Sequence, residues 1–349
     1  MFEGSLKLMT LAAAFALGAP VVAVTAVRAE DAAVVTDYRG PDRQERLEAG
    51  ARKEGQILLY TTGTQIEPLI DRFKQKYPFI RIEQVRADPQ QAAARAMQEY
   101  ATGLHIVDGY ELTSFSLAPL RAAKALAPIH APEAAAFAQG AIGPDRNWII
   151  VRESYAGIGY NPTKLAAADA PKSFADLLAP QWRGKMAIID SSTSIAFVAA
   201  MSISEGDDFV RKFKQQRPRV YNTTARALAN FVISGEVLLS PTIYNSHVIA
   251  SKAAGAAIEW IAPGPVVVND SAVAVASHAP HPHAMMLLTD FFLSPEGQAM
   301  YMKLGYNSPR GDMQSPEDKD LKKIYLSSLP DFETSYERWT RLYEATFLK

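Results

Sequence analysis

The chain has 349 residues, enough for two domains, and its 48% hydrophobic and 21% charged side chains are typical of a globular protein with a substantial core. Its 36 basic and 37 acidic side chains leave a net charge of −1. This balance argues against nucleic acid as a partner, because nucleic-acid-binding surfaces need a clustered basic excess. The chain has no cysteine, so disulfides, thiolate metal sites and cysteine nucleophiles are excluded.

The first 29 residues have the pattern of a cleavable export signal. Lys7 gives a weakly basic start, residues 8–27 are mostly apolar, and Val27-Arg28-Ala29 matches the small-x-small sequence that signal peptidase accepts. A membrane anchor is the alternative, but Gly18 and Pro20 would interrupt its span. We therefore expect residues 1–29 to be a signal peptide that directs the protein to the periplasm. No later window holds 18 uninterrupted apolar residues, so we expect a soluble mature protein.

Strand and helix patterns alternate after this segment. Short apolar or alternating runs predict strands at 57–60 and 80–85, and residues 103–108 lead into a third. Helix-compatible runs separate them, so a βαβ series with parallel strands and helices on both faces is expected. Further along, residues 266–268 and 272–276 predict a β segment, and residues 284–304 predict one strongly apolar helix.

Four predicted strands are each followed by a hydroxyl- or amide-rich turn at a helix N-terminus. The first N–H groups of a helix lack partners within it and carry partial positive charge, and ligands of open α/β sheets bind beyond the carboxyl ends of strands. Ordinary N-capping is the alternative for any one turn, whereas four turns favour a shared cleft. The candidate ligand-binding residues of these turns are Thr61, Thr62, Gly63, Thr64, Ser191, Ser192, Thr193, Ser194, Asn222, Thr223, Thr224, Tyr244 and Asn245.

Two charged residues are further candidates for ligand contact. The planar guanidinium of Arg152 could hold a carboxylate or phosphate, with an exposed strand arginine or a partner of Glu153 as the alternative. Glu111 could accept hydrogen bonds from solute hydroxyls or bind a metal, with a solvated loop acid as the alternative. Tyr244 could stack on the solute, or pack half-buried at a helix start.

Three histidines lie within six residues, at His278, His281 and His283. Their spacing resembles a metal site, but two prolines and a position between a strand and a helix favour a solvated connector. The sequence therefore predicts no metal site here.

Five short motifs resemble sequences of the periplasmic solute-binding proteins of ABC importers, in the class typified by ferric-iron-binding proteins. The motifs read ILLYTT at 57–62, PQWRGK at 180–185, SGEV at 234–237, FFLSPEGQ at 291–298 and YNSPR at 306–310. The resemblance covers roughly residues 50–345. The resemblance implies an α/β fold of the type II periplasmic binding class. In it, two lobes, each a mixed sheet flanked by helices, are joined by two crossing hinge strands.

The resemblance also implies a division of the chain. Lobe 1 is expected to be discontinuous and to comprise residues 30–147 and 266–308. Lobe 2 is expected to comprise residues 148–265, with hinge segments at 148–160 and 266–276. The C-terminal helices, 309–349, are expected to pack on lobe 2.

The function that the resemblance implies is capture of a small solute between the lobes and its delivery to the permease subunits of an ABC importer. The protein is then a monomer without catalysis or cofactor, and the sequence lacks the G-x-S-x-G, H-E-x-x-H and S-x-x-K motifs of enzymes. A periplasmic enzyme or a sensory module on the same scaffold is the alternative of another class.

The predicted cargo follows from a departure from the family pattern. Ferric-iron binders typically have adjacent tyrosines in the turn that here reads Thr242-Ile243-Tyr244-Asn245, which retains Tyr244 alone. A ferric ion needs several anionic oxygen ligands, and Tyr244 and Glu111 would be metal ligands only if ferric iron is the cargo. We therefore expect an anionic or oxygen-rich organic solute, such as a carboxylate, phosphonate or sugar phosphate, with ferric iron or a ferric chelate as the alternative.

Overall fold

The computed structural model describes residues 32–63 and 66–348. The predicted signal peptide and Thr64 lie outside the described residues. The helices are α1 (Ala32–Thr36), α2 (Arg43–Glu54), α3 (Glu67–Lys76), α4 (Pro89–Ala101), α5 (Ser114–Ala122), α6 (Ser192–Glu205), α7 (Asp207–Phe213), α8 (Ala225–Ser234), α9 (Asn245–Ala253), α10 (Pro282–Leu293), α11 (Pro295–Lys303), α12 (Pro316–Asp320) and α13 (Phe332–Tyr343). The strands are β1 (Gln56–Thr61), β2 (Arg81–Arg86), β3 (Gly109–Leu112), β4 (Ile149–Tyr160), β5 (Ala187–Ile189), β6 (Arg219–Tyr221), β7 (Leu239–Tyr244), β8 (Glu259–Ile261), β9 (Val266–Val275) and β10 (Lys323–Ile324).

One curled sheet runs through the molecule in the order β2-β1-β3-β9-β4-β7, with β10 beside β9 and β8 beside β4. Strands β1, β2 and β3 are parallel, as the βαβ pattern predicts. Strand β9 is antiparallel to both β3 and β4, and β4 is antiparallel to β7. The sheet is therefore mixed, because β9 returns to the first sheet from a distant part of the chain rather than through a βαβ crossover.

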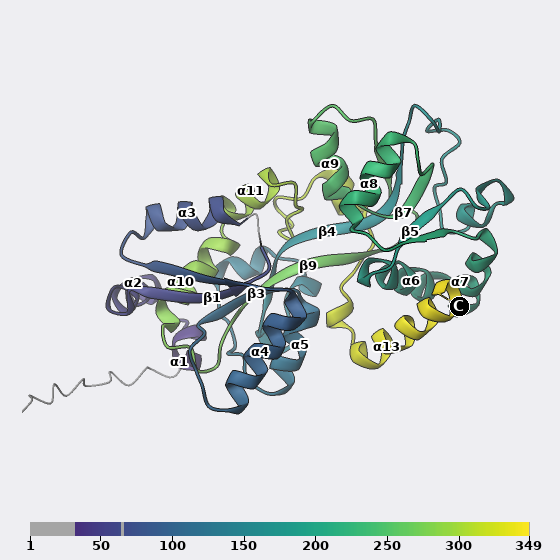
Figure 1. The fold of residues 1–349 in the computed structure, drawn as a ribbon. Coiled ribbons are helices and arrows are strands. Elements are labelled where there is room, and N and C mark those ends of the chain that lie inside the picture. The colour runs from purple at the N-terminus through teal and green to yellow at the C-terminus, as the bar shows by residue number, and fades with distance from the viewer. Residues whose placement is uncertain (1–31, 64–65, 349) are drawn as a thin grey trace, which may run out of the picture.

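The two largest hydrophobic cores lie in different lobes, and β4 and β9 pass between them (Figure 1). Strand β4 begins with Ile149 and Ile150 in the first core and ends with Ile158 and Tyr160 in the second. Strand β9 runs the opposite way, from Val267 in the second core to residues 272–275 in the first. Between these cores the two strands carry Arg152, Glu153 and Asp270 beside a smaller buried apolar cluster that includes Tyr155 and Val268, and this stretch forms the connection between the lobes.

Helices flank the sheet of each lobe (Figure 1). Helices α2 and α10 pack together on lobe 1, and α6 packs against α7 and α13 on lobe 2. The C-terminal helix contributes Trp339, Leu342 and Tyr343 to the second core. Among the residues that the structure describes, no helix is both long and apolar enough to cross a membrane.

The single helix predicted over residues 284–304 is wrong, because two helices meet there at Ser294. Ser294 has an extended backbone, with φ −66° and ψ 157°, and its hydroxyl accepts a hydrogen bond from the backbone N–H of Gly297. The residue before a proline disfavours the helical conformation, and Pro295 follows directly. The apolar periodicity continues across the break because α10 and α11 bury neighbouring faces in lobe 1.

Candidate functional site

A cavity of about 270 Å³ lies where the two lobes and the C-terminal segment meet. Lobe 1, the crossing strands, lobe 2 and residues 326–336 all contribute to its wall. Its lining residues are Asp88, Pro89, Gln90, Thr113, Ser114, Phe115, Ala156, Ser192, Ala196, Tyr244, Val267, Val268, Asn269, Asp270, Leu326, Ser327, Phe332 and Tyr336. The volume falls just below the usual range of pockets for drug-sized ligands, so the cavity suits a smaller solute.

The N-termini of two helices form the lobe 1 side of the cavity. Asp88 caps α4, and its carboxylate accepts hydrogen bonds from the backbone N–H groups of Gln90 and Gln91 at 3.0 and 3.3 Å. Thr113 caps α5, and its hydroxyl accepts a hydrogen bond from the N–H of Ser116. Both turns follow the carboxyl ends of parallel strands, the edge at which ligands of open α/β sheets bind.

Asp270 of β9 joins the crossing strand to lobe 1 at the cavity. The backbone N–H of Ser114 donates to one carboxylate oxygen at 2.7 Å, and the Ser114 hydroxyl donates to the other. Burial raises the pKa of Asp270 to about 6, although the Ser114 hydrogen bonds and the charge of Arg152 favour the ionised form. The cavity therefore contains a buried carboxylate that takes up a proton at higher pH than an exposed aspartate does.

The lobe 2 side of the cavity is formed by the start of α6 and by Tyr244 at the end of β7. Ser192 is exposed to the cavity, and Ser191 caps the helix by accepting a hydrogen bond from the N–H of Thr193. The Tyr244 and Thr193 hydroxyls are 2.7 Å apart and hydrogen-bonded. Ser194 is buried, and its hydroxyl donates to the carbonyl of Ile189. Of the predicted residues in this turn, Ser192 is therefore the one placed against the cavity.

Three aromatic rings join the lobes at the cavity wall. Phe115 of α5 lies 4.5 Å from the Tyr336 ring and 5.3 Å from the Phe332 ring, measured between ring centroids. Phe332 and Tyr336 belong to α13, which packs on α6 of lobe 2. The aromatic cluster of Phe115, Phe332 and Tyr336 is therefore a direct side-chain contact between lobe 1 and the helix carried by lobe 2.

Glu111 is fully buried on β3, so the interpretation of a solvated loop acid is wrong. Its carboxylate accepts hydrogen bonds from the hydroxyls of Thr61 and Ser271. The Arg152 guanidinium is 3.3 Å from the same carboxylate and lies over the Tyr306 ring, 4.4 Å from its centroid. Arg152 is thus neither an exposed arginine nor a partner of Glu153, and it is absent from the lining of the cavity.

Glu153 has its own set of partners on the other face of the connection. It accepts hydrogen bonds from the hydroxyls of Tyr155 and Tyr325, each at 2.6 Å, and pairs with Lys323 at 3.0 Å. Burial and the neighbouring Glu153 charge raise the pKa of both tyrosines. Because each buried charge has a partner, this network fixes the C-terminal segment to the crossing strands.

The described residues of the first predicted turn form a tight local structure. The Thr61 side chain is buried, and its hydroxyl accepts a hydrogen bond from the Gly63 N–H at 2.9 Å. The N–H of Thr62 donates to the carbonyl of Glu111. Thr61, Thr62 and Gly63 are not among the lining residues of the cavity, so the structure connects this turn to the Glu111 network instead.

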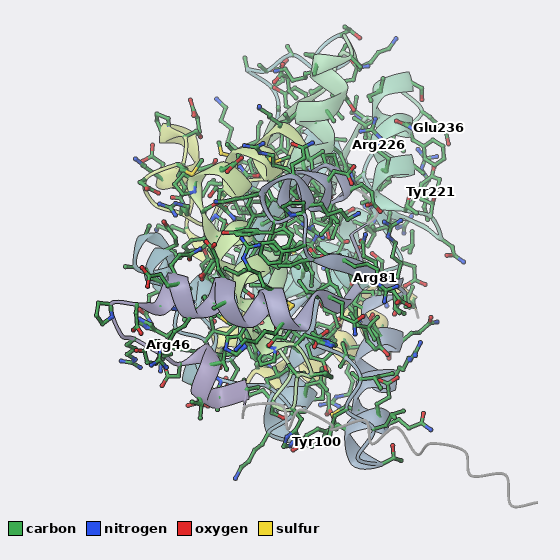
Figure 2. The ribbon with its side chains drawn as sticks, turned by 90° about the vertical axis from the view of Figure 1, so that its left-hand side faces the viewer. Arg46, Arg81, Tyr100, Tyr221, Arg226 and Glu236 are labelled. Atoms are coloured by element: carbon green, nitrogen blue, oxygen red, sulfur yellow. The ribbon has the colours of Figure 1, made fainter. Side chains whose placement is uncertain are left out.

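The third predicted turn lies away from the cavity. Thr224 caps α8 through a hydrogen bond from the N–H of Ala227, and neither it nor Asn222 or Thr223 lines the cavity. Tyr221, directly before this turn, lies beside Glu236 at the edge of lobe 2 (Figure 2).

Asn245, the last residue of the fourth turn, is buried. Its side-chain oxygen accepts a hydrogen bond from the Tyr155 N–H, and its side-chain amide donates to the Asn307 side chain. It therefore connects lobe 2 to β4 and to the segment that follows α11.

The prediction of a solvated connector holds only for His278, which is exposed, and is wrong for His281 and His283. His281 lies 3.0 Å from Asp108, and His283 lies 2.7 Å from Glu54. His278 lies beside the His105 ring at a centroid distance of 4.3 Å. Within residues 32–63 and 66–348, no group of three or more histidine, aspartate or glutamate side chains is arranged to hold a metal ion.

The lobe 1 side of the cavity and its aromatic cluster were not predicted from the sequence. Asp88-Pro89 and Thr113-Ser114 follow strands and begin helices, so the strand-turn-helix pattern used for the other turns could have found them. Phe332 and Tyr336 gave no such signal, because two rings at i and i+4 on a helix are typical of ordinary packing.

Comparisons with known proteins fit this geometry. A sequence model of the bacterial extracellular solute-binding proteins matches residues 115–336, more than half of the chain. The chain therefore belongs to the bacterial extracellular solute-binding proteins.

Solved structures show the same two-lobed fold. Iron-bound HitA from Pseudomonas aeruginosa matches with a TM-score of 0.70 and 22% identity, over 83% of this chain and 99% of that one. The Trichodesmium protein IdiA (FutA), solved with iron and citrate, matches with a TM-score of 0.70 and 16% identity, over 84% of this chain and 100% of that one. AfuA from Actinobacillus pleuropneumoniae, solved with fructose-6-phosphate, matches with a TM-score of 0.67 and 19% identity, over 84% of this chain and 99% of that one. The predicted two-lobed fold of the type II periplasmic binding class is confirmed.

Proposed function

We propose that this protein is the periplasmic component of an ABC importer that captures a small, oxygen-rich organic solute in the cavity between its lobes and delivers it to membrane permease subunits. The observation that carries the proposal is a 270 Å³ cavity lined by both lobes and by the crossing strands. A solute in contact with both lobes stabilises the arrangement in which the lobes are close. The difference between the solute-bound and the solute-free arrangement is what a permease can recognise. Export through the signal at residues 1–29 and a monomeric state are part of the proposal.

The polar lining supports an oxygen-rich solute. Ser114, Ser192 and Tyr244 bring hydroxyls to the cavity, and Gln90 and Asn269 bring side-chain amides. These groups both donate and accept hydrogen bonds, which suits hydroxyl or carbonyl groups on a solute. The sequence suggested Arg152 as the basic partner of a carboxylate, phosphonate or sugar phosphate. In the structure Arg152 is instead paired with Glu111.

Ferric iron receives less support from the side chains. The two candidate ligands are Glu111, whose carboxylate already has three partners, and Tyr244, whose hydroxyl is bonded to Thr193. Burial raises the pKa of Tyr244 to about 12, which disfavours the phenolate that a ferric ion requires. Iron binding would need both residues to exchange their partners.

Thermal unfolding of the purified protein against a panel of solutes tests the proposal. The panel holds organic acids, sugar phosphates, phosphonates, polyols, amines, ferric citrate and free ferric ion. A ligand at a hundred times its Kd stabilises the protein by about 2.7 kcal/mol, which raises the Tm measurably. A rise with an organic solute supports the proposal, and a rise with ferric ion alone contradicts it.

A further inference from the structure

The charge of the cavity lining is negative. Asp88 and Asp270 both line it, and among the lining residues that the structure describes none is a lysine or an arginine. Arg152 is held away from the cavity by Glu111 and Tyr306. An anionic solute would therefore meet two carboxylates without a basic side chain to balance them.

The helix N-termini on the lobe 1 side of the cavity do not reverse this charge. The N–H groups that an anion would need are already bonded to side chains, those of Gln90 and Gln91 to Asp88 and that of Ser114 to Asp270. A helix N-terminus carries roughly half a positive charge, whereas each carboxylate carries a full negative one. Both helix ends on the lobe 1 side thus present net negative charge to the cavity.

Aromatic rings surround the same space. Phe115, Tyr244, Phe332 and Tyr336 all line the cavity, and three of them form the cluster that joins the lobes. The faces of such rings attract cations, and the attraction strengthens where water is excluded. Carboxylates and ring faces together are the two kinds of group that recognise an ammonium.

The position of Asp270 costs stability, which agrees with a role in binding. Asp270 is 9% exposed as a whole residue, and burial raises the pKa of its carboxyl. Arg152, Glu153 and Tyr325 are the charged and titratable groups that influence it from the neighbouring strands and from the C-terminal segment. A cationic solute would supply the positive charge that this carboxylate lacks within the cavity.

We infer that the solute carries a cationic group, a protonated amine or a quaternary ammonium, that is held by Asp88, Asp270 and the aromatic rings of the cavity. This inference rests on the proposed function and narrows its solute class. The oxygen-rich part of the solute contacts the serine, asparagine and glutamine side chains, so an amino alcohol or an amine of similar size fits the lining.

Calorimetric titration separates the inference from the proposed function. The probes are ethanolamine, choline and putrescine as cations, glycerol and ribose as neutral polyols, and citrate and fructose-6-phosphate as anions. Binding of at least one cation, with weaker or no binding of polyols and anions, is expected. Binding of a polyol or an anion without any cation overturns the inference and leaves the proposed function standing. Binding of ferric ion alone contradicts both.

Substitutions then locate the cation. Asp88→Asn and Asp270→Asn should each weaken binding of the cation about 10- to 100-fold, because each removes a charge-assisted contact. Asp88 is exposed, so Asp88→Asn keeps the test decisive even where Asp270→Asn alters folding. Asp71→Asn, on the exposed face of α3 and outside the cavity, is the matched control and should bind as the wild type does. Unchanged cation affinity in Asp88→Asn and in folded Asp270→Asn would overturn the inference.

Discussion

The rings of Phe115 and Tyr336 lie 4.5 Å apart, although one belongs to lobe 1 and the other to the C-terminal helix that packs on lobe 2. The contact lies at the wall of the cavity, so it places a hydrophobic connection between the lobes beside the proposed solute. A solute in the cavity and this ring contact favour the same arrangement of the lobes.

A double-mutant cycle measures that connection. Phe115→Ala, Tyr336→Ala and the double variant should show a coupling free energy of about 0.5–1.5 kcal/mol in urea unfolding, the usual value for a packed aromatic pair. Phe79→Ala combined with Tyr336→Ala is the control, because Phe79 packs on the first core without contacting Tyr336. Additive effects in the Phe115 cycle would show that the rings do not stabilise the contact between lobes.

Glu111 and Arg152 are predicted to stabilise the fold rather than to bind the solute. Glu111→Ala should lower the free energy of unfolding by about 3–5 kcal/mol, because it leaves the largely buried Arg152 without its partner. Solute affinity, measured by calorimetry on the fraction that is folded, should change little. A large loss of affinity with unchanged stability would place the pair in the binding site.

Asp270 should make stability depend on pH. Its pKa is about 6 in the folded protein against an ordinary value of 3.8, so the folded state binds the proton more tightly than the unfolded state does. The stability that this proton contributes is fully present below pH 3.8 and is lost as the pH rises through 6, by about 3 kcal/mol in total. Asp270→Asn should therefore stabilise the protein more at pH 7 than at pH 4, as urea unfolding at the two pH values will show. A stability difference that stays constant would contradict the prediction.

His281 gives a second pH dependence with a different window. Its hydrogen bond to Asp108 raises the pKa of His281 above its ordinary value of 6.5. The stabilisation is complete below pH 6.5 and is lost as the pH rises through the higher folded-state value. The stability advantage of the wild type over His281→Asn should thus shrink between about pH 5 and about pH 8. Circular-dichroism melts at both ends check the sign, and an advantage that grows with pH would refute it.

The sequence predicted the parts of the fold that depend on local patterns. The alternation of apolar strands and amphipathic helices predicted β1, β2 and α3. The Ser-Ser-Thr-Ser run at 191–194 predicted a turn before a helix, and α6 begins within that run, at Ser192. The break at Ser294 was hidden because apolar side chains continue on both sides of it. The antiparallel pairing of β9 with β3 depends on contacts between residues more than 150 positions apart, which periodicity does not encode.

The site was harder to predict because its charges find partners across the fold. Arg152 and Glu111 looked like ligand contacts from the sequence, but they are 41 positions apart and pair with each other. Asp270 lies in an apolar strand pattern and gave no signal, yet Ser114 of a distant helix holds its carboxylate at the cavity. Local pattern indicated which residues begin helices, and tertiary packing determined which of them face the space between the lobes.

The central claim is that solute binds between the lobes, and one pair of variants on a single helix tests it most directly. Ser192 is exposed to the cavity at the first turn of α6, and Ser204 is exposed at the other end of the same helix. Ser192→Trp should fill the 270 Å³ cavity and abolish calorimetric binding of the best solute, while Ser204→Trp should bind it with wild-type affinity. Wild-type affinity in a folded Ser192→Trp protein would mean that the solute binds elsewhere.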